Sequence, residues 1–166
     1  MTDALPVRPA ARVLVLDPAG RGLLFGARLV DLATPPGPVL YWYTPGGQVE
    51  PGEALRQAAA RELVEEIGLV VDPAVLEGPV WLRRVVAPLL GVPTDHRETY
   101  FVLRDVVHEV DVSGQTEIEA YEDQPHRWWS AAEIAASDEI FVPTELAAAL
   151  EQLLAGPWSG PPRIVV

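Results

Sequence analysis

The chain contains no cysteine and no lysine, and a single methionine, among its 166 residues. The absence of cysteine excludes disulfides, thiolate catalysis and metal centres that depend on cysteine ligands. The sequence also lacks an apolar run of about 18 residues that could span a membrane, and no basic segment followed by an apolar run marks a signal peptide at its start. We therefore expect a cytoplasmic protein with no membrane partner.

Positive charge is scarce as well. The chain has 12 basic residues, all arginine, against 24 acidic ones, which gives a formal net charge of −12. Long nucleic acid is not an expected partner, because neutralising many phosphates requires a basic face. A small nucleotide or diphosphate remains compatible, because a metal ion and a few arginines can neutralise it locally.

The overall composition is that of an ordinary globular protein, with 49% hydrophobic and 22% charged residues. A chain of this length can bury one well-formed core. We expect a single domain over residues 1–166, with residues 1–10 as a polar lead-in and residues 156–166 as a Pro/Gly-rich tail.

One stretch stands out, Gly46 to Leu69, with the sequence GGQVEPGEALRQAAARELVEEIGL. The two glycines at its start let the backbone pass close to a ligand. From Ala54 to Ile67 it lacks proline and glycine and is rich in good helix formers. The pattern predicts a helix that starts near Glu53 and stops at Gly68.

Three glutamates of this helix lie close together: Glu65 and Glu66 follow Glu62 by three and four positions. They fall beside a predicted apolar stripe of Ala59, Ala60, Leu63, Val64 and Ile67. Like charges at this spacing repel one another, so the cluster needs an explanation. Binding of a hard divalent cation such as Mg²⁺ would explain it. The alternative is a solvated acidic face.

The spacing resembles the Nudix box at every specified position: Gly47, Glu53, Arg61-Glu62-Leu63, Glu65-Glu66 and Gly68-Leu69. The resemblance implies a MutT-like Nudix hydrolase, which uses Mg²⁺, often replaceable by Mn²⁺, to cleave a phosphoanhydride in a nucleotide. The box covers a small part of the chain, so it defines the chemistry better than the substrate.

The resemblance also implies roles for the residues of the box. Glu62, Glu65 and Glu66 correspond to metal-binding and catalytic glutamates, with Glu66 as a direct ligand. Arg61 corresponds to the residue that orients a neighbouring glutamate. The carbonyl of Gly47 corresponds to a further metal contact, and Glu53 to the glutamate that braces the loop against the helix.

Apolar runs of strand length flank the box at residues 11–16, 22–29, 39–43, 80–90 and 98–103. The first two are separated by a turn and predict a hairpin. Residues 143–154 predict a second long helix, with leucines 146, 150, 153 and 154 buried. The elements indicate an α/β protein, and the resemblance implies the Nudix α/β/α sandwich, with a central mixed sheet and the box helix on one face.

Several residues outside the box are candidates for binding substrate. Trp42 or its neighbour Tyr43 could stack on a base, although core packing is an alternative. The other candidates are cations for phosphate, with surface exposure as the alternative: Arg28, Arg83, Arg84 and Arg97.

The acidic stretch 113–124 predicts a loop. Nudix proteins often place a further glutamate there, as metal ligand or catalytic base. Glu119 and Glu122 are the candidates for that role, with Glu117 and Glu98 as the next to consider. After this loop, Ser130 and Glu133 predict a helix N-terminus with a capping box.

The function that we expect is metal-dependent hydrolysis of a nucleoside diphosphate linked to another group, such as an ADP-ribose-like compound or a nucleoside triphosphate. A non-catalytic nucleotide sensor would leave the intact glutamate cluster unexplained. An isomerase acting on an isoprenoid diphosphate would lack its usual catalytic cysteine. A homodimer is left open.

Overall fold

The computed structural model describes residues 4–29, 39–115 and 125–166. Within them the β structure forms two sheets, one of five strands in the order β4-β1-β6-β5-β9 and one of four in the order β7-β2-β3-β8. The strands are β1 Val7–Val15, β2 Gly22–Leu29, β3 Val39–Tyr43, β4 Gly46–Gln48, β5 Glu77–Leu89, β6 Val92–Leu103, β7 His126–Trp129, β8 Ile140–Val142 and β9 Arg163–Ile164.

Both sheets are mixed. In the first, β1 pairs in parallel with β6 and antiparallel with β4, while β5 and β6 form a long antiparallel hairpin. In the second, β3 is antiparallel to β2 and parallel to β8. With the helices around them, these sheets confirm the predicted α/β fold class.

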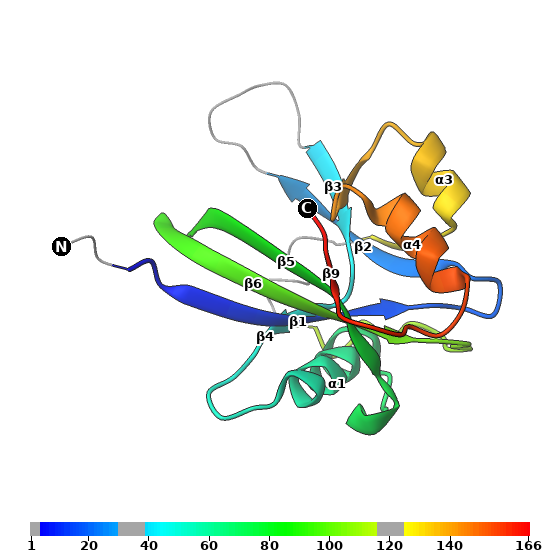
Figure 1. The fold of residues 1–166 in the computed structure, drawn as a ribbon, viewed down its shortest axis with the longest axis horizontal. Coiled ribbons are helices and arrows are strands. Elements are labelled where there is room, and N and C mark those ends of the chain that lie inside the picture. Colours follow the sequence, from blue (N-terminus) through cyan, green and yellow to red (C-terminus); the bar gives the residue numbers. More distant parts are fainter. Residues whose placement is uncertain (1–3, 30–38, 116–124) are drawn as a thin grey trace.

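The box helix α1 runs from Leu55 to Ile67 and lies on one side of β1 (Figure 1). Gly68 ends it in the left-handed conformation, with φ of 69°. The N–H groups of Gly68 and Leu69 donate to the carbonyls of Val64 and Leu63 at 3.1 Å each. The bond from Gly68 to Val64 is the 5→1 bond of an αL cap, and it confirms the predicted stop.

The buried face of α1 differs from the predicted stripe at one position. Leu63 and Ile67 are fully buried against β1, together with three alanines of the helix, whereas Val64 is 43% exposed. The buried arc instead includes Glu62 and Glu66. The predicted stripe was drawn from apolar residues alone, and it therefore missed that two carboxylates lie on the buried side.

A 3₁₀ turn, Pro73–Val75, and two further helices, α3 Ala131–Ala136 and α4 Leu146–Leu154, complete the described elements. Ser130 caps α3, with the reciprocal bond to Glu133 that the sequence predicts. In α4, Leu146, Leu150 and Leu153 are buried as predicted, but Leu154 is 43% exposed. None of the described helices is long and apolar enough to cross a bilayer.

The predicted hairpin of the first two strands is wrong. β1 and β2 lie in different sheets, and a single bridge between Leu16 and Gly22 joins them. β1 pairs along its whole length with residues 95–103 of β6. The strands also extend into segments predicted to be irregular, because residues 7–10 belong to β1 and residues 92–97 to β6.

The C-terminal tail packs against the first sheet, where β9 pairs in parallel with β5. Arg104, just after β6, holds the segment that leads to β9. Its guanidinium donates to both carboxylate oxygens of Glu77, at 2.8 and 3.0 Å, and to the carbonyls of Leu153 and Gly156. The backbone N–H of Trp158 also donates to Glu77.

Replacing Arg104 by methionine is expected to lower the free energy of unfolding by about 1–3 kcal/mol, because it removes the guanidinium partner of Glu77 and the donor to two carbonyls. Hydrogen bonding from Arg104 lowers the pKa of Glu77. The loss should therefore be full above the unfolded pKa of a glutamate, about 4.3, and shrink as pH falls through the folded pKa. Urea unfolding at several pH values measures both effects.

Arg127→Met is the matched control, because its ion pair with Glu133 is about half exposed on both sides. Its effect should stay below about 1 kcal/mol. Equal losses in the two variants, or a loss for Arg104→Met that does not depend on pH, would contradict the anchoring role.

Candidate active site

A cleft of about 810 Å³ opens beside the glycine loop and the glutamates of the box helix. Its charged side chains come from three strands and from α1, among them Arg8, Arg12, Glu62, Glu66, Arg83 and Glu98. Aromatic and aliphatic side chains also line it, among them Tyr41, Tyr43, Val85, Ala87, Leu89 and Val142. The cleft therefore offers charged and apolar surfaces side by side, as sites for nucleotide-sized ligands do.

Two glycines bring the backbone of the box close to its neighbours. Gly46 has a φ of 135°, and a Cβ there would lie 2.1 Å from the carbonyl oxygen of Ala11. At Gly47 a Cβ would lie 2.5 Å from a carboxylate oxygen of Glu62. The second glycine thus leaves room for a buried carboxylate directly against the loop.

Arg61 joins the loop to the helix. It donates to both oxygens of Glu53, at 2.9 and 3.0 Å, and to the carbonyl of Gln48 at 2.9 Å. It also donates to Glu62 at 2.8 Å and to Glu65 at 3.2 Å. The hydrogen bond that Arg61 donates to Glu53 is the main cause that raises the pKa of Arg61. One guanidinium therefore orients three carboxylates of the box.

Glu62 and Glu66 are buried, at 8% and 6% exposure, and both line the cleft. The N–H of Gly46 donates to Oε2 of Glu66 at 2.7 Å. Burial raises the pKa of Glu62, although the hydrogen bond from Arg61 opposes the shift. Two carboxylates kept out of water on one side of a helix favour binding of a positive ion.

The donor set suits a hard cation. Glu62, Glu66 and the carbonyl of Gly47 offer oxygen atoms, which Mg²⁺ prefers. Within the described ranges, no three His, Cys, Asp or Glu side chains form a ready-made metal site. The residues fit a cation that takes one or two carboxylates and completes its shell with water and substrate phosphates.

Sequence reasoning missed the network around Glu98 as a feature of the cleft. Glu98 accepts from Arg12 at 3.2 Å, from Arg83 at 3.0 Å and from the hydroxyl of Tyr100 at 2.9 Å. Burial opposes its ionisation, but Arg12, Tyr100 and Arg83 together lower the pKa of Glu98. The available signal was Arg12 itself, the one charge within the apolar run at residues 11–16.

The predicted role of Trp42 in base stacking is not compatible with its position. Trp42 is 5% exposed and packs edge-on against Trp129, with ring centroids 5.1 Å apart. Side chains alternate along a strand, so its neighbours Tyr41 and Tyr43 point into the cleft instead. Core packing, the alternative at Trp42, is the one observed.

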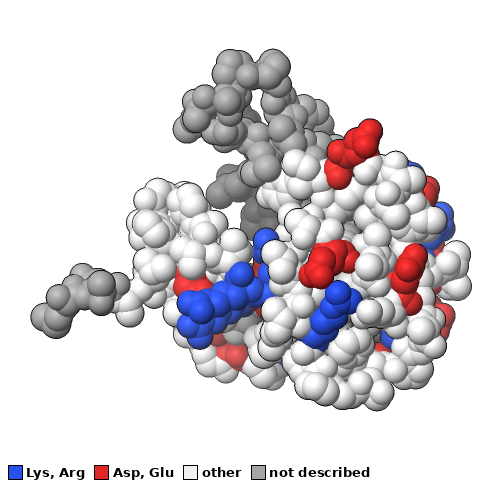
Figure 2. Space-filling view, turned by 45° about the horizontal axis from the view of Figure 1, so that its top comes forward, with Lys and Arg blue, Asp and Glu red and all other residues white. Residues whose placement is uncertain are grey.

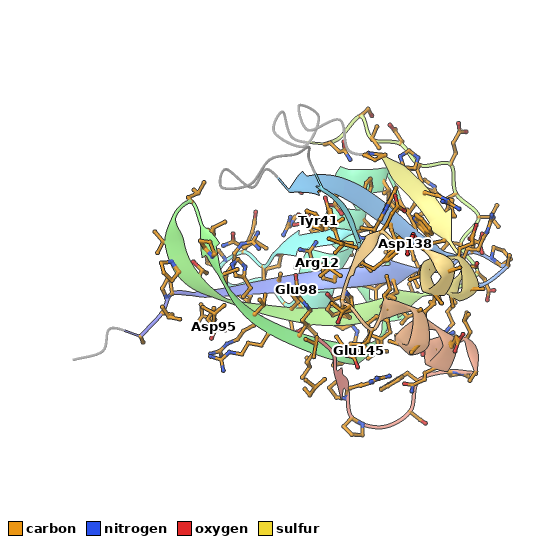
Figure 3. All side chains as sticks on the ribbon, turned by 90° about the horizontal axis from the view of Figure 1, so that it is seen from above. Arg12, Tyr41, Asp95, Glu98, Asp138 and Glu145 are labelled. Carbon is orange, nitrogen blue, oxygen red and sulfur yellow. The ribbon has the colours of Figure 1, made fainter. Side chains whose placement is uncertain are left out.

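Arg84 and Arg97 also lie outside the cleft. Both pair with Asp95, at 2.7 and 2.9 Å, and their side chains are 65% and 57% exposed. Along β5 the other candidate, Arg83, lines the cleft, and neither Arg84 nor Arg97 does. Figure 3 shows Arg12, Glu98 and Tyr41 near one another and Asp95 apart from them.

The side chains of the remaining predicted residues lie outside the part of the chain that the structure describes. The backbone of Arg28 pairs with Leu40 in the second sheet, and its side chain is outside the described part. Glu119 and Glu122 lie outside the described residues altogether.

These features define an α/β enzyme whose site is built on a glycine loop and an acidic helix. A family model for the NUDIX domain matches residues 6–150. The chain therefore belongs to the Nudix family, and it is a hydrolase of that family.

Curated relatives differ in their named substrates. An RNA pyrophosphohydrolase of Cereibacter sphaeroides is 28% identical over 80% of this chain and 82% of its own length. One of Dinoroseobacter shibae is 38% identical over 51% of this chain and half of its own length. A putative 8-oxo-dGTP diphosphatase 2 of Mycobacterium tuberculosis is 40% identical over 42% of this chain and 59% of its own.

Solved structures share the fold. The E. coli dihydroneopterin triphosphate pyrophosphohydrolase superposes with a TM-score of 0.59 at 20% identity, covering 92% of this chain and 99% of that one. A MutT protein of Bacillus halodurans gives 0.59 at 18% identity over 90% and 84%. At these identities the likeness shows the fold alone.

Replacing Gly46 by alanine is expected to destabilise the protein by about 2 kcal/mol or more, because the new Cβ meets backbone atoms at a positive φ. Gly22→Ala is the control, since its Cβ would meet only Leu16 at 3.9 Å, an ordinary contact. Chemical denaturation of both variants measures the difference. Similar stabilities would contradict the close approach of the loop to β1.

Proposed function

We propose that this Nudix hydrolase uses Mg²⁺, replaceable by Mn²⁺, to cleave a phosphoanhydride bond in a small nucleotide. The substrates that we favour are nucleoside triphosphates and nucleoside diphosphates linked to another group, as in ADP-ribose-like compounds. The observation that carries this proposal is the burial of Glu62 and Glu66 side by side at the cleft, next to Gly47.

In this proposal Glu66, Glu62 and the carbonyl of Gly47 hold the cation, with Glu65 at the exposed edge. A bound Mg²⁺ supplies charge for the phosphate oxygens and lowers the pKa of an attacking water. Arg61 keeps Glu62 and Glu65 in place through the bonds described above. Each of these side chains comes from α1, which is rigidly packed on β1.

Arg8 is the cleft cation best suited to contact phosphate. Its Nε donates to the neutral side chain of Gln48 at 3.3 Å, whereas Arg12 and Arg83 are both paired with Glu98. Burial and the nearby charge of Arg12 lower the pKa of Arg8. A phosphate anion would relieve that repulsion, because it brings negative charge beside both arginines.

The apolar surface of the cleft is the proposed place for the organic part of the substrate. Tyr41 and Tyr43 line it, with ring centroids 5.5 Å apart, and the aliphatic side chains of β5 and β8 complete it. Aromatic and aliphatic surfaces of this kind favour a flat, weakly polar group such as a base.

Charge favours small nucleotides over the RNA that the names of some relatives indicate. The net charge of the chain is −12. On the face seen in Figure 2, the described acidic and basic side chains are interspersed without a continuous basic stripe. Binding a long polyanion would require such a stripe.

A cytoplasmic location and a homodimer stay predictions.

The test is product release from a panel of nucleoside triphosphates, nucleotide sugars, ADP-ribose, dinucleoside polyphosphates and a 5′-triphosphorylated RNA oligonucleotide, each with Mg²⁺, Mn²⁺ or chelator. We expect cleavage of at least one small nucleotide that chelator abolishes. Exclusive cleavage of the RNA would contradict the substrate class. Binding without turnover throughout would favour the nucleotide sensor.

Glu66→Gln is expected to lower kcat at least a hundredfold, because it removes a charged ligand from the proposed cation site. Glu151→Gln, on the exposed side of α4, is the control and should retain normal turnover. Steady-state kinetics on the best substrate of the panel, with thermal melting as a check of folding, gives the comparison. A folded Glu66→Gln enzyme of normal activity would exclude this residue as a ligand.

We further propose that a glutamate of the 113–124 stretch, Glu119 or Glu122, is the catalytic base. One of the two Gln variants should reduce kcat by about 10²-fold or more with little change in KM, because it removes a proton acceptor. The other serves as its control, and pre-steady-state measurements test whether chemistry is slowed. If neither variant has an effect, the base lies elsewhere.

A further inference from the structure

Glu98 occupies the floor of the cleft on β6 but belongs to none of the groups proposed to hold the cation. It is 9% exposed, and three donors surround it: Arg12, Arg83 and Tyr100. Arg12 contributes two contacts, from Nε and from Nη2, both at 3.2 Å to the same oxygen. A buried carboxylate with this many donors is rigidly held.

The other end of Arg12 reaches the glycine loop. Its Nη1 donates to the carbonyl of Gly46 at 2.8 Å and, more weakly, to that of Thr44 at 3.4 Å. The N–H of the same Gly46 donates to Oε2 of Glu66 at 2.7 Å. A continuous chain of bonds therefore runs from Glu98 through Arg12 and Gly46 to Glu66.

We propose that Glu98 is a positioning residue for the cation site, which it sets through Arg12 and the Gly46 backbone. The inference rests on the proposed function, in which Glu66 holds the cation. Glu98 also compensates the positive charge of Arg12. Glu66 is itself among the carboxylates that act on this guanidinium. Without Glu98, Arg12 would be an unbalanced buried charge, and it would compete with the cation for Glu66.

The same strand offers a matched control on its opposite face. Asp95 is 2% exposed and is also paired with two arginines, Arg84 and Arg97. That cluster does not line the cleft. Neutralising Asp95 therefore removes a comparable carboxylate from β6 but leaves the chain of bonds to Glu66 intact.

The experiment is titration of the full-length protein with Mn²⁺ alone, followed by electron paramagnetic resonance. Glu98→Gln should weaken Mn²⁺ binding by about 10- to 100-fold, the usual range for a residue that orients a metal ligand. Asp95→Asn should stay within about twofold of the unmodified chain. Turnover of Glu98→Gln should recover as Mn²⁺ is raised to saturation, which a structural defect alone would not allow.

Two further variants separate the relay from general loss of stability. Arg12→Lys keeps the charge, but a single ammonium cannot replace the fork between Glu98 and Gly46, so it should weaken Mn²⁺ binding as Glu98→Gln does. Arg83→Met removes a partner of Glu98 that does not contact Gly46, and should leave binding near normal. If Glu98→Gln fails to fold, Arg12→Lys against Arg83→Met decides.

The outcomes also separate this inference from the proposed function. Equal Mn²⁺ affinities for Glu98→Gln and Asp95→Asn, with the unmodified chain binding Mn²⁺, would overturn the positioning role alone. Absence of Mn²⁺ binding by the unmodified chain would overturn the cation site itself.

Discussion

The burial of two carboxylates on one helix is the constraint on which the rest of the structure depends. Glu62 and Glu66 are one turn apart on α1 and are both more than nine-tenths buried. Removing carboxylates from water is costly unless they are paired or hydrogen-bonded. Arg61 donates to Glu62, and the N–H of Gly46 donates to Glu66. Two buried carboxylates on the same side of one helix suit a cation.

Two arginines of the site, Arg61 and Arg12, divide their hydrogen bonds among several acceptors. Arg61 is shared among Glu53, Glu62 and Glu65, and Arg12 is directed toward Glu98 and the loop carbonyls. Arg61 and Arg12 thus both have carboxylate partners. The helix ends at Gly68 and packs through its alanines and leucine against β1, which keeps this arrangement fixed.

The parts of the fold that depend on local sequence were predictable. The box helix, its stop at Gly68 and the cap at Ser130 follow from propensity and capping, and the contact of Arg61 with Glu65 follows from helical spacing. Strand pairing was not, since β1 pairs with β6 some ninety positions away in the register Ala10 with Glu98. Nothing local in either segment specifies that partner.

At the site, the sequence could not choose between neighbours on one strand. Trp42 and Tyr43 were both candidates, as were Arg83 and Arg84, and of these only Tyr43 and Arg83 line the cleft. In a strand a shift of one residue changes the face of the sheet, and the facing direction depends on the sheet as a whole. Glu98 and Arg12 became recognisable as a unit only when β1 and β6 were seen together.

The central claim is that Glu62, Glu66 and the Gly47 carbonyl form a cation site that a substrate diphosphate completes. Anomalous diffraction from a crystal of the protein with Mn²⁺ and a non-hydrolysable nucleotide tests it most directly. The account predicts manganese bound to Glu66, in contact with the phosphates and with the base toward Tyr41 and Tyr43. Manganese bound elsewhere, with the phosphates remote from α1, would contradict it.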